Sequence, residues 1–302
     1  MNLSPTKCRF CKSASFVKDG WRYNSSGRKQ RYPCKVCGRR FAEDDGFLKM
    51  KFRPETITAA MDLCHTSKSS RKARNWLERH WEEFPKSHVS IWRWVQKYSQ
   101  LVGDFVEVLE PQTSDEWLAD EMVLFVGGKW SWNWEVMDSR TRFWLASKIT
   151  EGRDRTVEDA EAVLSKARGR TEGRPEKLVT DGLPAYRRGI SWSLGWRQCE
   201  HVVELSWKEG KHRTNPIERK VQTTRMRLKT MRCLESLETG RNRLKGARIH
   251  YNFVRPHMSL GGTPAEAAGL NLDLGRDKWL SLIRLSSKIF ILIYLPITEQ
   301  SP

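Results

Sequence analysis

Apolar residues recur at helical spacing in the first third of the chain and at strand spacing beyond it. Between residues 54 and 102, three runs, PETITAAMDLC, SSRKARNWLERHW and HVSIWRWVQKYSQLV, have the spacing of amphipathic helices. The third run places its apolar residues on one face and its basic residues on another. Three short helices ending in a basic one are typical of a helix-turn-helix. A helical bundle without DNA contact is the alternative.

Beyond Glu116 the apolar positions alternate, which predicts strands. WLADEMVLFV and KWSWNWEVMD form the first two, separated by Gly127 and Gly128, and FWLASKI forms the third. An amphipathic helix follows in RTVEDAEAVLSKAR, then a fourth strand in KLVTD, a fifth near residues 199–205, and a long basic helix from about Asn215. The order predicts an α/β domain with a mixed sheet flanked by helices.

Four cysteines near the N-terminus are arranged as two close pairs. Cys8, Cys11, Cys34 and Cys37 read C-x2-C, 22 intervening residues, C-x2-C, with a turn between two short strands in the intervening stretch. Two such turns can supply four thiolates to one tetrahedral ion, which predicts a structural Zn²⁺ in a zinc ribbon. Two disulfides are the alternative reading. Cys64, Cys199 and Cys233 have no such pattern and are predicted to be core residues.

The net charge of the chain indicates which class of partner it binds. The chain carries 54 basic and 36 acidic residues, so its net charge is 54 − 36 = +18. Such an excess suits a polyanion and favours nucleic acid, with solubility alone as the alternative. The longest apolar run, Ile289–Ile297, is shorter than the roughly 20 residues that span a bilayer, so we expect no membrane association and an intracellular protein.

Three acidic residues stand in similar local contexts, each beside an apolar run. They are Asp120 in WLADEMVLF, Asp181 in KLVTDGLPAY and Glu218 in NPIERKVQTTRMR. Carboxylates from separate elements can converge on divalent metal ions that cut phosphodiesters. Taken singly, each has a structural alternative: a strand residue facing solvent, an ordinary turn and a helix surface residue.

Taken together, these motifs resemble those of insertion-sequence transposases of the DDE type, nearest the insertion-sequence-six group. The segment YNFVRPHMSLGGTPAEAAG, residues 251–269, is similar to the end of integrase catalytic cores, and the resemblance spans residues 116–269. One departure is Met122, where the group usually has Thr. The resemblance implies an RNase H-like fold in which Asp120 lies within the first strand, Asp181 ends the fourth, and Glu218 comes from a helix packed on the sheet.

The resemblance also implies an activity. We expect an Mg²⁺-dependent transposase, with Mn²⁺ able to substitute, that has Asp120, Asp181 and Glu218 as catalytic metal ligands. It would bind the terminal inverted repeats of its element, cleave the DNA and join the ends to target DNA as a homodimer or larger assembly. The alternatives are a catalytically inactive DNA-binding regulator derived from such a transposase and a structure-selective nuclease on the same fold.

Four basic residues are expected to contact DNA. Arg225 lies two turns after Glu218 on the same helix face, an offset at which the resembling family places a DNA contact, and Lys220 extends this surface. Arg93 and Lys97 belong to the basic face of the third predicted helix. For His201, Arg255 and His257, a structural role and a role at the site both remain open.

These patterns divide the chain into four parts. We expect a zinc ribbon in residues 1–50, a helix-turn-helix in residues 51–105, an RNase H-like core in residues 113–270, and a tail of uncertain role in residues 271–302. A protein of this kind is expected in a prokaryotic cytoplasm, associated with the nucleoid.

Overall fold

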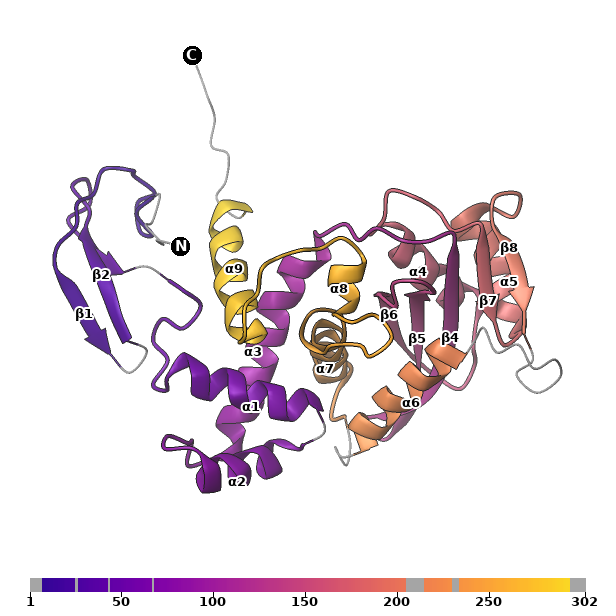
Figure 1. Cartoon of the computed structure of the whole chain (residues 1–302), viewed down its shortest axis with the longest axis horizontal. Coiled ribbons are helices and arrows are strands. Elements are labelled where there is room, and N and C mark those ends of the chain that lie inside the picture. Colours follow the sequence, from indigo (N-terminus) through magenta and orange to yellow (C-terminus); the bar gives the residue numbers. More distant parts are fainter. Residues whose placement is uncertain are drawn as a thin grey trace, which may run out of the picture.

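The computed structural model describes residues 7–24, 27–42, 44–66, 68–204, 215–229 and 234–293. A five-stranded mixed sheet lies at one end of the molecule, a small ribbon lies at the other, and a group of helices connects them (Figure 1). Among the described residues, no helix is both long enough and apolar enough to cross a membrane.

The sheet has the strand order β6-β5-β4-β7-β8. Its strands are β4 (Glu116–Val126), β5 (Lys129–Asp138), β6 (Trp144–Glu151), β7 (Lys177–Thr180) and β8 (Glu200–Val203). The first three are antiparallel, and β7 and β8 are parallel to β4. Numbered along the chain, the order is 3-2-1-4-5, which is that of the RNase H-like fold. The predicted fold class is therefore confirmed.

Alternation along β4 divides its side chains between two hydrophobic cores. Trp117 and Ala119 are buried on the face covered by α4 (Val157–Arg168) and α5 (Pro184–Ile190). Leu118 and Met122 are buried on the opposite face against α6 (Asn215–Lys229). Because successive side chains of a strand point to opposite faces, Asp120 shares the α6 face with Leu118 and Met122. This parity aims the first carboxylate at the helix that carries Glu218.

A two-residue hairpin joins β4 to β5. Val126 pairs with Lys129, and Gly127 and Gly128 have φ values of 58° and 77°. Two consecutive positive φ values match the right-handed twist of the flanking strands, and glycine adopts them without steric cost. The sequence motif Gly-Gly therefore determines the hairpin, and the hairpin sets the register of the longest strand pair.

The helices before the sheet share a hydrophobic core with helices that follow it. α1 (Pro54–Thr66), α2 (Ser70–His80) and α3 (His88–Glu107) pack with α7 (Leu237–Ile249) and α9 (Lys278–Ile293). Ser87 caps α3 as predicted, since its side chain accepts a hydrogen bond from the Val89 N–H. α3 continues five residues past Val102, where the apolar pattern predicts its end. In the tail, Trp279, Leu282 and Ile283 of α9 are fully or almost fully buried against this core, so part of the tail is a packing element.

The ribbon has its own small core. Its strands β1 (Trp21–Asn24), β2 (Gly27–Pro33) and β3 (Arg40–Ala42) form an antiparallel sheet around Phe16, Tyr32 and Phe41. The sequence pattern predicts two of these strands, and the third, only three residues long, has no pattern of its own. The remaining short helices are η1 (Ser191–Gly195), η2 (His250–Val254) and α8 (Pro264–Ala267).

Candidate active site

Asp120 and Asp181 lie at the point where β7 ends beside β4. β7 pairs with β4 only through residues 116–118, so β4 continues beyond its neighbour. Leu118 is opposite Val179, and continuing this parallel register sets Asp181 opposite Asp120. Neighbouring strands are about 4.8 Å apart, so Asp120 and Asp181 belong to adjacent strands at the point where β7 ends.

Burial raises the pKa of Asp120 to about 7, and the negative charges of Glu121, Glu135 and Asp181 add to this shift. The Glu121 N–H donates to Asp120 Oδ1 at 2.8 Å and acts in the opposite direction. Burial and then Asp181 also raise the pKa of Glu121, although Arg155 and Tyr186 hydrogen-bond to its carboxylate. Mutually repelling oxygens of this kind fit divalent cations, which neutralise such a cluster.

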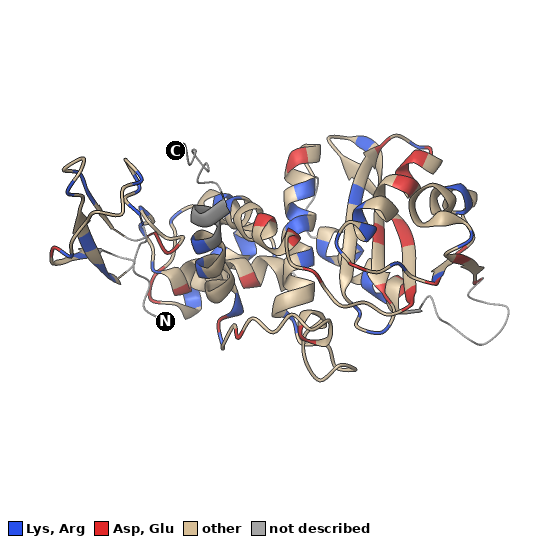
Figure 2. Ribbon diagram, turned by 90° about the horizontal axis from the view of Figure 1, so that it is seen from above, with Lys and Arg blue, Asp and Glu red and all other residues tan. Residues whose placement is uncertain are grey.

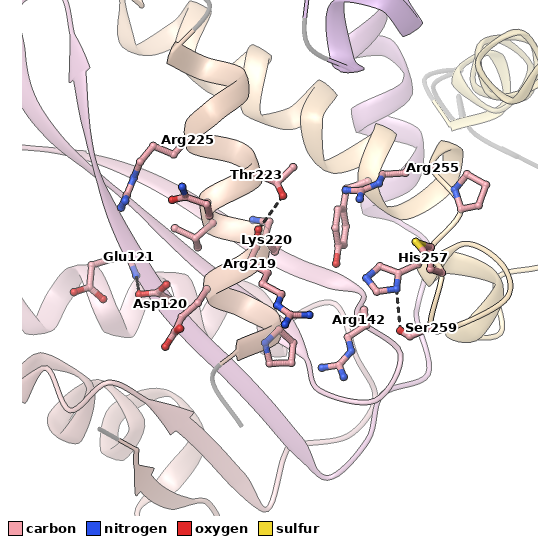
Figure 3. Close-up of a pocket in the computed structure, with 17 residues that line it drawn as sticks. Asp120, Glu121, Arg142, Arg219, Lys220, Thr223, Arg225, Arg255, His257 and Ser259 are labelled. Atoms are coloured by element: carbon pink, nitrogen blue, oxygen red, sulfur yellow. Dashed lines mark hydrogen bonds between the residues drawn. The ribbon is translucent and has the colours of Figure 1, made fainter. Parts of the chain in front are cut away.

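Glu218 and Asp120 line one pocket beside α6. The pocket has a volume of about 1100 Å³, and its rim carries basic side chains. Figure 3 shows Arg225 on the same side of α6 as Asp120 and Glu121, with Arg142, Arg255 and His257 on the other side. Asp181 is exposed outside this pocket, where its carboxylate accepts a hydrogen bond from the Leu183 N–H at 3.2 Å.

Comparison with known proteins is consistent with this arrangement. Residues 114–257 match a protein-family model described as a DDE domain. The chain carries a DDE domain. The resemblance predicted from the ADE, TDG and NPIER motifs is thereby confirmed.

Transposases of Staphylococcus aureus are among the relatives of the DDE domain. Those for the insertion sequence-like element IS431mec and for the insertion sequence element IS257 in transposon Tn4003 are each 23% identical over 176 residues. The similarity covers 56% of this chain and 70% of each relative. Among solved structures, the HTLV-2 integrase catalytic core in complex with magnesium aligns with a TM-score of 0.39 and 14% identity, over 53% of this chain and 98% of that one. The catalytic core of BIV integrase aligns with a TM-score of 0.36 and 14% identity, over 51% of this chain and 93% of that one.

Among the described residues, Asp120, Asp181 and Glu218 do not form a compact cluster of ligand atoms. In the described part of the chain, only the four N-terminal thiols form a group of three or more potential ligands with atoms all within 4.8 Å of one another. Carboxylate oxygens are the ligands that Mg²⁺ prefers, so Asp120, Asp181 and Glu218 would suit divalent ions as a donor set.

Lys220 is buried, although the sequence predicts it on the surface that contacts DNA. Its side chain is 2% exposed and forms an ion pair with the fully buried Glu135 of β5. It also lies against the ring of Trp144. Burial lowers the pKa of Lys220 to about 7, and Glu135 opposes this shift. A phosphate cannot reach a buried, paired ammonium group, so this placement corrects the expected DNA contact.

The other basic residues expected to contact DNA are on the surface. Arg225 is exposed and lines the pocket, and Arg93 is exposed near the N-terminal end of α3. Lys97 is also exposed, although its ammonium group contacts the Met50 sulfur at 3.8 Å and lies over the Tyr98 ring at 4.8 Å. Burial of the ammonium group lowers the pKa of Lys97.

Two residues that line the pocket, Arg142 and Arg219, are not indicated by the sequence motifs. Arg142 lies in the turn between β5 and β6 with φ of 60°, a left-handed conformation uncommon for a residue with a side chain. Asp138 holds this turn by accepting 2.7 Å hydrogen bonds from the Thr141 N–H and hydroxyl. Arg219 is adjacent to Glu218 and could have been found from that proximity. No local pattern marks Arg142, because the turn brings it to the pocket from a distant part of the sequence.

His201 occupies a supporting position. Its Nε2 lies 2.9 Å from the Thr180 hydroxyl, the last residue of β7 before Asp181. Burial, and to a lesser extent Arg187, lower its pKa. This contact holds β8 against the end of β7. It therefore favours a structural role for His201 over a role at the site.

The four N-terminal cysteines form a separate cluster in the ribbon. Cys8 and Cys37 sulfurs are 3.8 Å apart, and those of Cys11 and Cys34 are 3.4 Å apart. All four are free thiols, so the structure has no disulfide here. Ligands at about 2.3 Å from a tetrahedral Zn²⁺ stand about 3.8 Å from one another. The Cys37 N–H lowers the pKa of Cys34 to about 6, whereas burial and the neighbouring thiols raise that of Cys11 to about 12, so the first thiolate of the cluster forms at Cys34. The cluster therefore fits Zn²⁺.

Cys64 and Cys199 are buried as predicted, and Cys233 lies outside the described residues.

Proposed function

We propose that this protein is a transposase that binds the inverted repeats at the ends of its element, cleaves the DNA there and joins the ends to target DNA. The DDE domain of residues 114–257 and the similarity to proteins named as transposases support this function. Two observations support it: Asp120 on β4 lies beside the end of β7, which Asp181 follows, and Asp120 lines one pocket with Glu218 of α6.

Asp120, Asp181 and Glu218 would hold two Mg²⁺ ions, or Mn²⁺. When bound, the ions would activate the attacking water or 3′-hydroxyl and stabilise the leaving oxygen. The protein's own part is positioning. The basic rim of the pocket neutralises phosphates, and Arg225 would hold the DNA strand next to Asp120, on the side of α6 where Figure 3 shows them together.

DNA recognition is assigned to the segments before the DDE domain. Recognition helices contact base edges through their N-terminal residues, and the N-terminal half of α3 exposes Val89, Trp92 and Arg93. Figure 2 shows lysine and arginine on the ribbon, on the connecting helices and around the sheet, with acidic residues on the strands of the sheet. Holding two DNA ends together requires at least two copies of the protein.

The test uses DNA that carries the inverted repeats flanking the gene. We expect the wild type to nick and join this DNA with Mg²⁺, and Asp120→Asn to bind it without cutting. Asp115→Asn, which changes an exposed carboxylate just before β4, is the matched control and should remain active. Equal activity of the Asp120→Asn and wild-type proteins would refute the site. Binding by the wild type without cleavage would indicate a regulator, and cleavage irrespective of end sequence without joining would indicate a nuclease.

A further inference from the structure

The hairpin of β4 and β5 carries exposed aromatic side chains at its tip. Phe125 and Trp130 are opposite each other in the register, and their ring centroids are 4.4 Å apart. Phe125 is 50% exposed and Trp130 is 40% exposed. Large aromatic rings exposed side by side give up favourable burial, so such a pair often marks a binding site.

Arginine side chains accompany this aromatic pair. Arg153 lies over the Trp130 ring with its guanidinium carbon 5.9 Å from the centroid, and Arg155 lies over the Trp132 ring at 4.8 Å. Two hydrogen bonds fix the segment to β5: Gly152 N–H donates to the Trp130 carbonyl at 3.0 Å, and Trp132 Nε1 donates to the Arg153 carbonyl at 2.9 Å. We call Phe125, Trp130, Trp132, Arg153 and Arg155 the aromatic platform.

A shallow pocket of about 460 Å³ opens on the platform. It is lined by Lys129, Trp130, Glu151, Gly152 and Arg153. Lys129 and Arg153 lie here beside the acidic Glu151 and the nearby Asp154, and Arg155 is paired with Glu121. Exposed planar rings accompanied by cations suit a ligand that combines a flat base with a phosphate.

The platform lies on the face of β4 opposite to that of Asp120 and is linked to the candidate active site through Glu121. Arg155 Nη1 donates to Glu121 Oε1 at 2.7 Å, and Glu121 adjoins Asp120 on β4. Phe125 is four residues beyond Glu121, which at about 3.4 Å per residue places the tip roughly 14 Å along the strand. This distance corresponds to about four stacked nucleotides at 3.4 Å each.

We propose that the aromatic platform binds an unpaired nucleotide of the DNA substrate by stacking its base on Trp130 and Phe125. The proposal rests on the proposed function, because it assigns a place to DNA that extends from the carboxylates. The cations neutralise the phosphates on either side, and the rings accept any base, since every base has a π face. The platform would hold a strand that has left the duplex and extends along β4 beyond Glu121.

Two oligonucleotide probes test the platform. One is a blunt 30-base-pair duplex, and the other is the same duplex with a 3′ overhang of four thymidines, both measured by fluorescence anisotropy at one salt concentration. We expect the wild type to bind the overhang probe more tightly. Trp130→Ala should weaken binding to this probe at least fivefold and leave the blunt duplex within twofold, since loss of a stacked ring costs about 1–3 kcal/mol. Trp130→Phe should retain most of the preference.

Trp192→Ala is the matched control, because Trp192 of η1 is 57% exposed and lies outside the platform. It should bind both probes as the wild type does. Trp130→Ala that keeps the overhang preference, or that weakens both probes equally, would overturn the proposal. A change in sedimentation with the preference intact would show that the rings contact a second copy instead, and would also overturn it. Failure of the wild type to bind either probe would instead count against the proposed function.

Discussion

The ion pair of Lys220 and Glu135 allows a quantitative test of how α6 is held on the sheet. Both side chains are almost inaccessible, at 2% and 0% exposure, and Asn133 Nδ2 donates to Glu135 Oε1 at 2.7 Å. Replacing Lys220 with Met keeps the length of the side chain and removes its charge. The Glu135 carboxylate then remains buried without its cation, and breaking a buried pair in this way costs about 3–5 kcal/mol.

The expected result is a fall in thermal stability. For a domain of this size about 1 kcal/mol lowers the melting temperature by roughly 2–4 °C, so Lys220→Met should lower it by roughly 6–20 °C. The double variant Lys220→Met/Glu135→Gln removes both charges and should recover most of the loss. Circular dichroism during heating measures both, and Lys72→Met, on the exposed face of α2, serves as the control.

Two results would refute this reasoning. A Lys220→Met variant that melts within 2 °C of the wild type would show that Glu135 does not depend on the ammonium group. A double variant less stable than the single one would show that the two charges are not coupled. An unchanged melting temperature with weaker DNA binding would instead restore the surface role expected from the sequence.

Three further predictions concern the ribbon, the helical core and DNA binding. Cys8→Ser should abolish binding of one equivalent of zinc and unfold the ribbon while the helical signal of the remaining chain persists; loss of that signal, or retained zinc, would contradict the four-thiol site. Gly246→Ala should destabilise the protein by about 1–3 kcal/mol in urea denaturation despite alanine's better helix propensity, because a Cβ there would meet the Ser99 hydroxyl at 2.3 Å and the His65 ring at 2.4 Å; Gly173→Ala, with nothing within 4 Å, should not. Affinity for DNA should fall about a thousandfold or more between 50 and 200 mM salt, as expected for six or more phosphate contacts, and a flat titration would exclude such a surface.

The strands of the DDE domain could be predicted from the sequence because their signals are local. Alternation in WLADEMVLFV and KWSWNWEVMD and the Gly127–Gly128 turn specify the hairpin without reference to the rest of the chain. The position of Lys220 could not be predicted in this way. Lys220 is close to Glu218 on a basic helix, which suggests a surface residue. Its environment, however, depends on Glu135, which β5 places beneath α6.

The helical segment shows a similar limit. Periodicity identifies α1, α2 and α3, but it does not reveal that α3 lies against α7, more than a hundred residues later in the chain. That contact depends on Gly246, whose missing side chain lets the two helices approach. The apolar residues of α9 likewise have a burial partner only in the folded protein, because their cover comes from α1 and α3.

The anchoring of α3 has a consequence for where the DNA is cut. Glu107, at the C-terminal end of α3, forms ion pairs with Arg248 of α7 and with Arg170 beyond α4, the second at 3.3 Å. These cations hold the pKa of Glu107 below its usual value although burial acts to raise it. α3 has 20 residues and is therefore about 30 Å long, and the end that bears Arg93 is the exposed one. If DNA is held at that end, the length of α3 sets its distance from the carboxylates. The fold would therefore fix the spacing between the bound sequence and the cleaved phosphate.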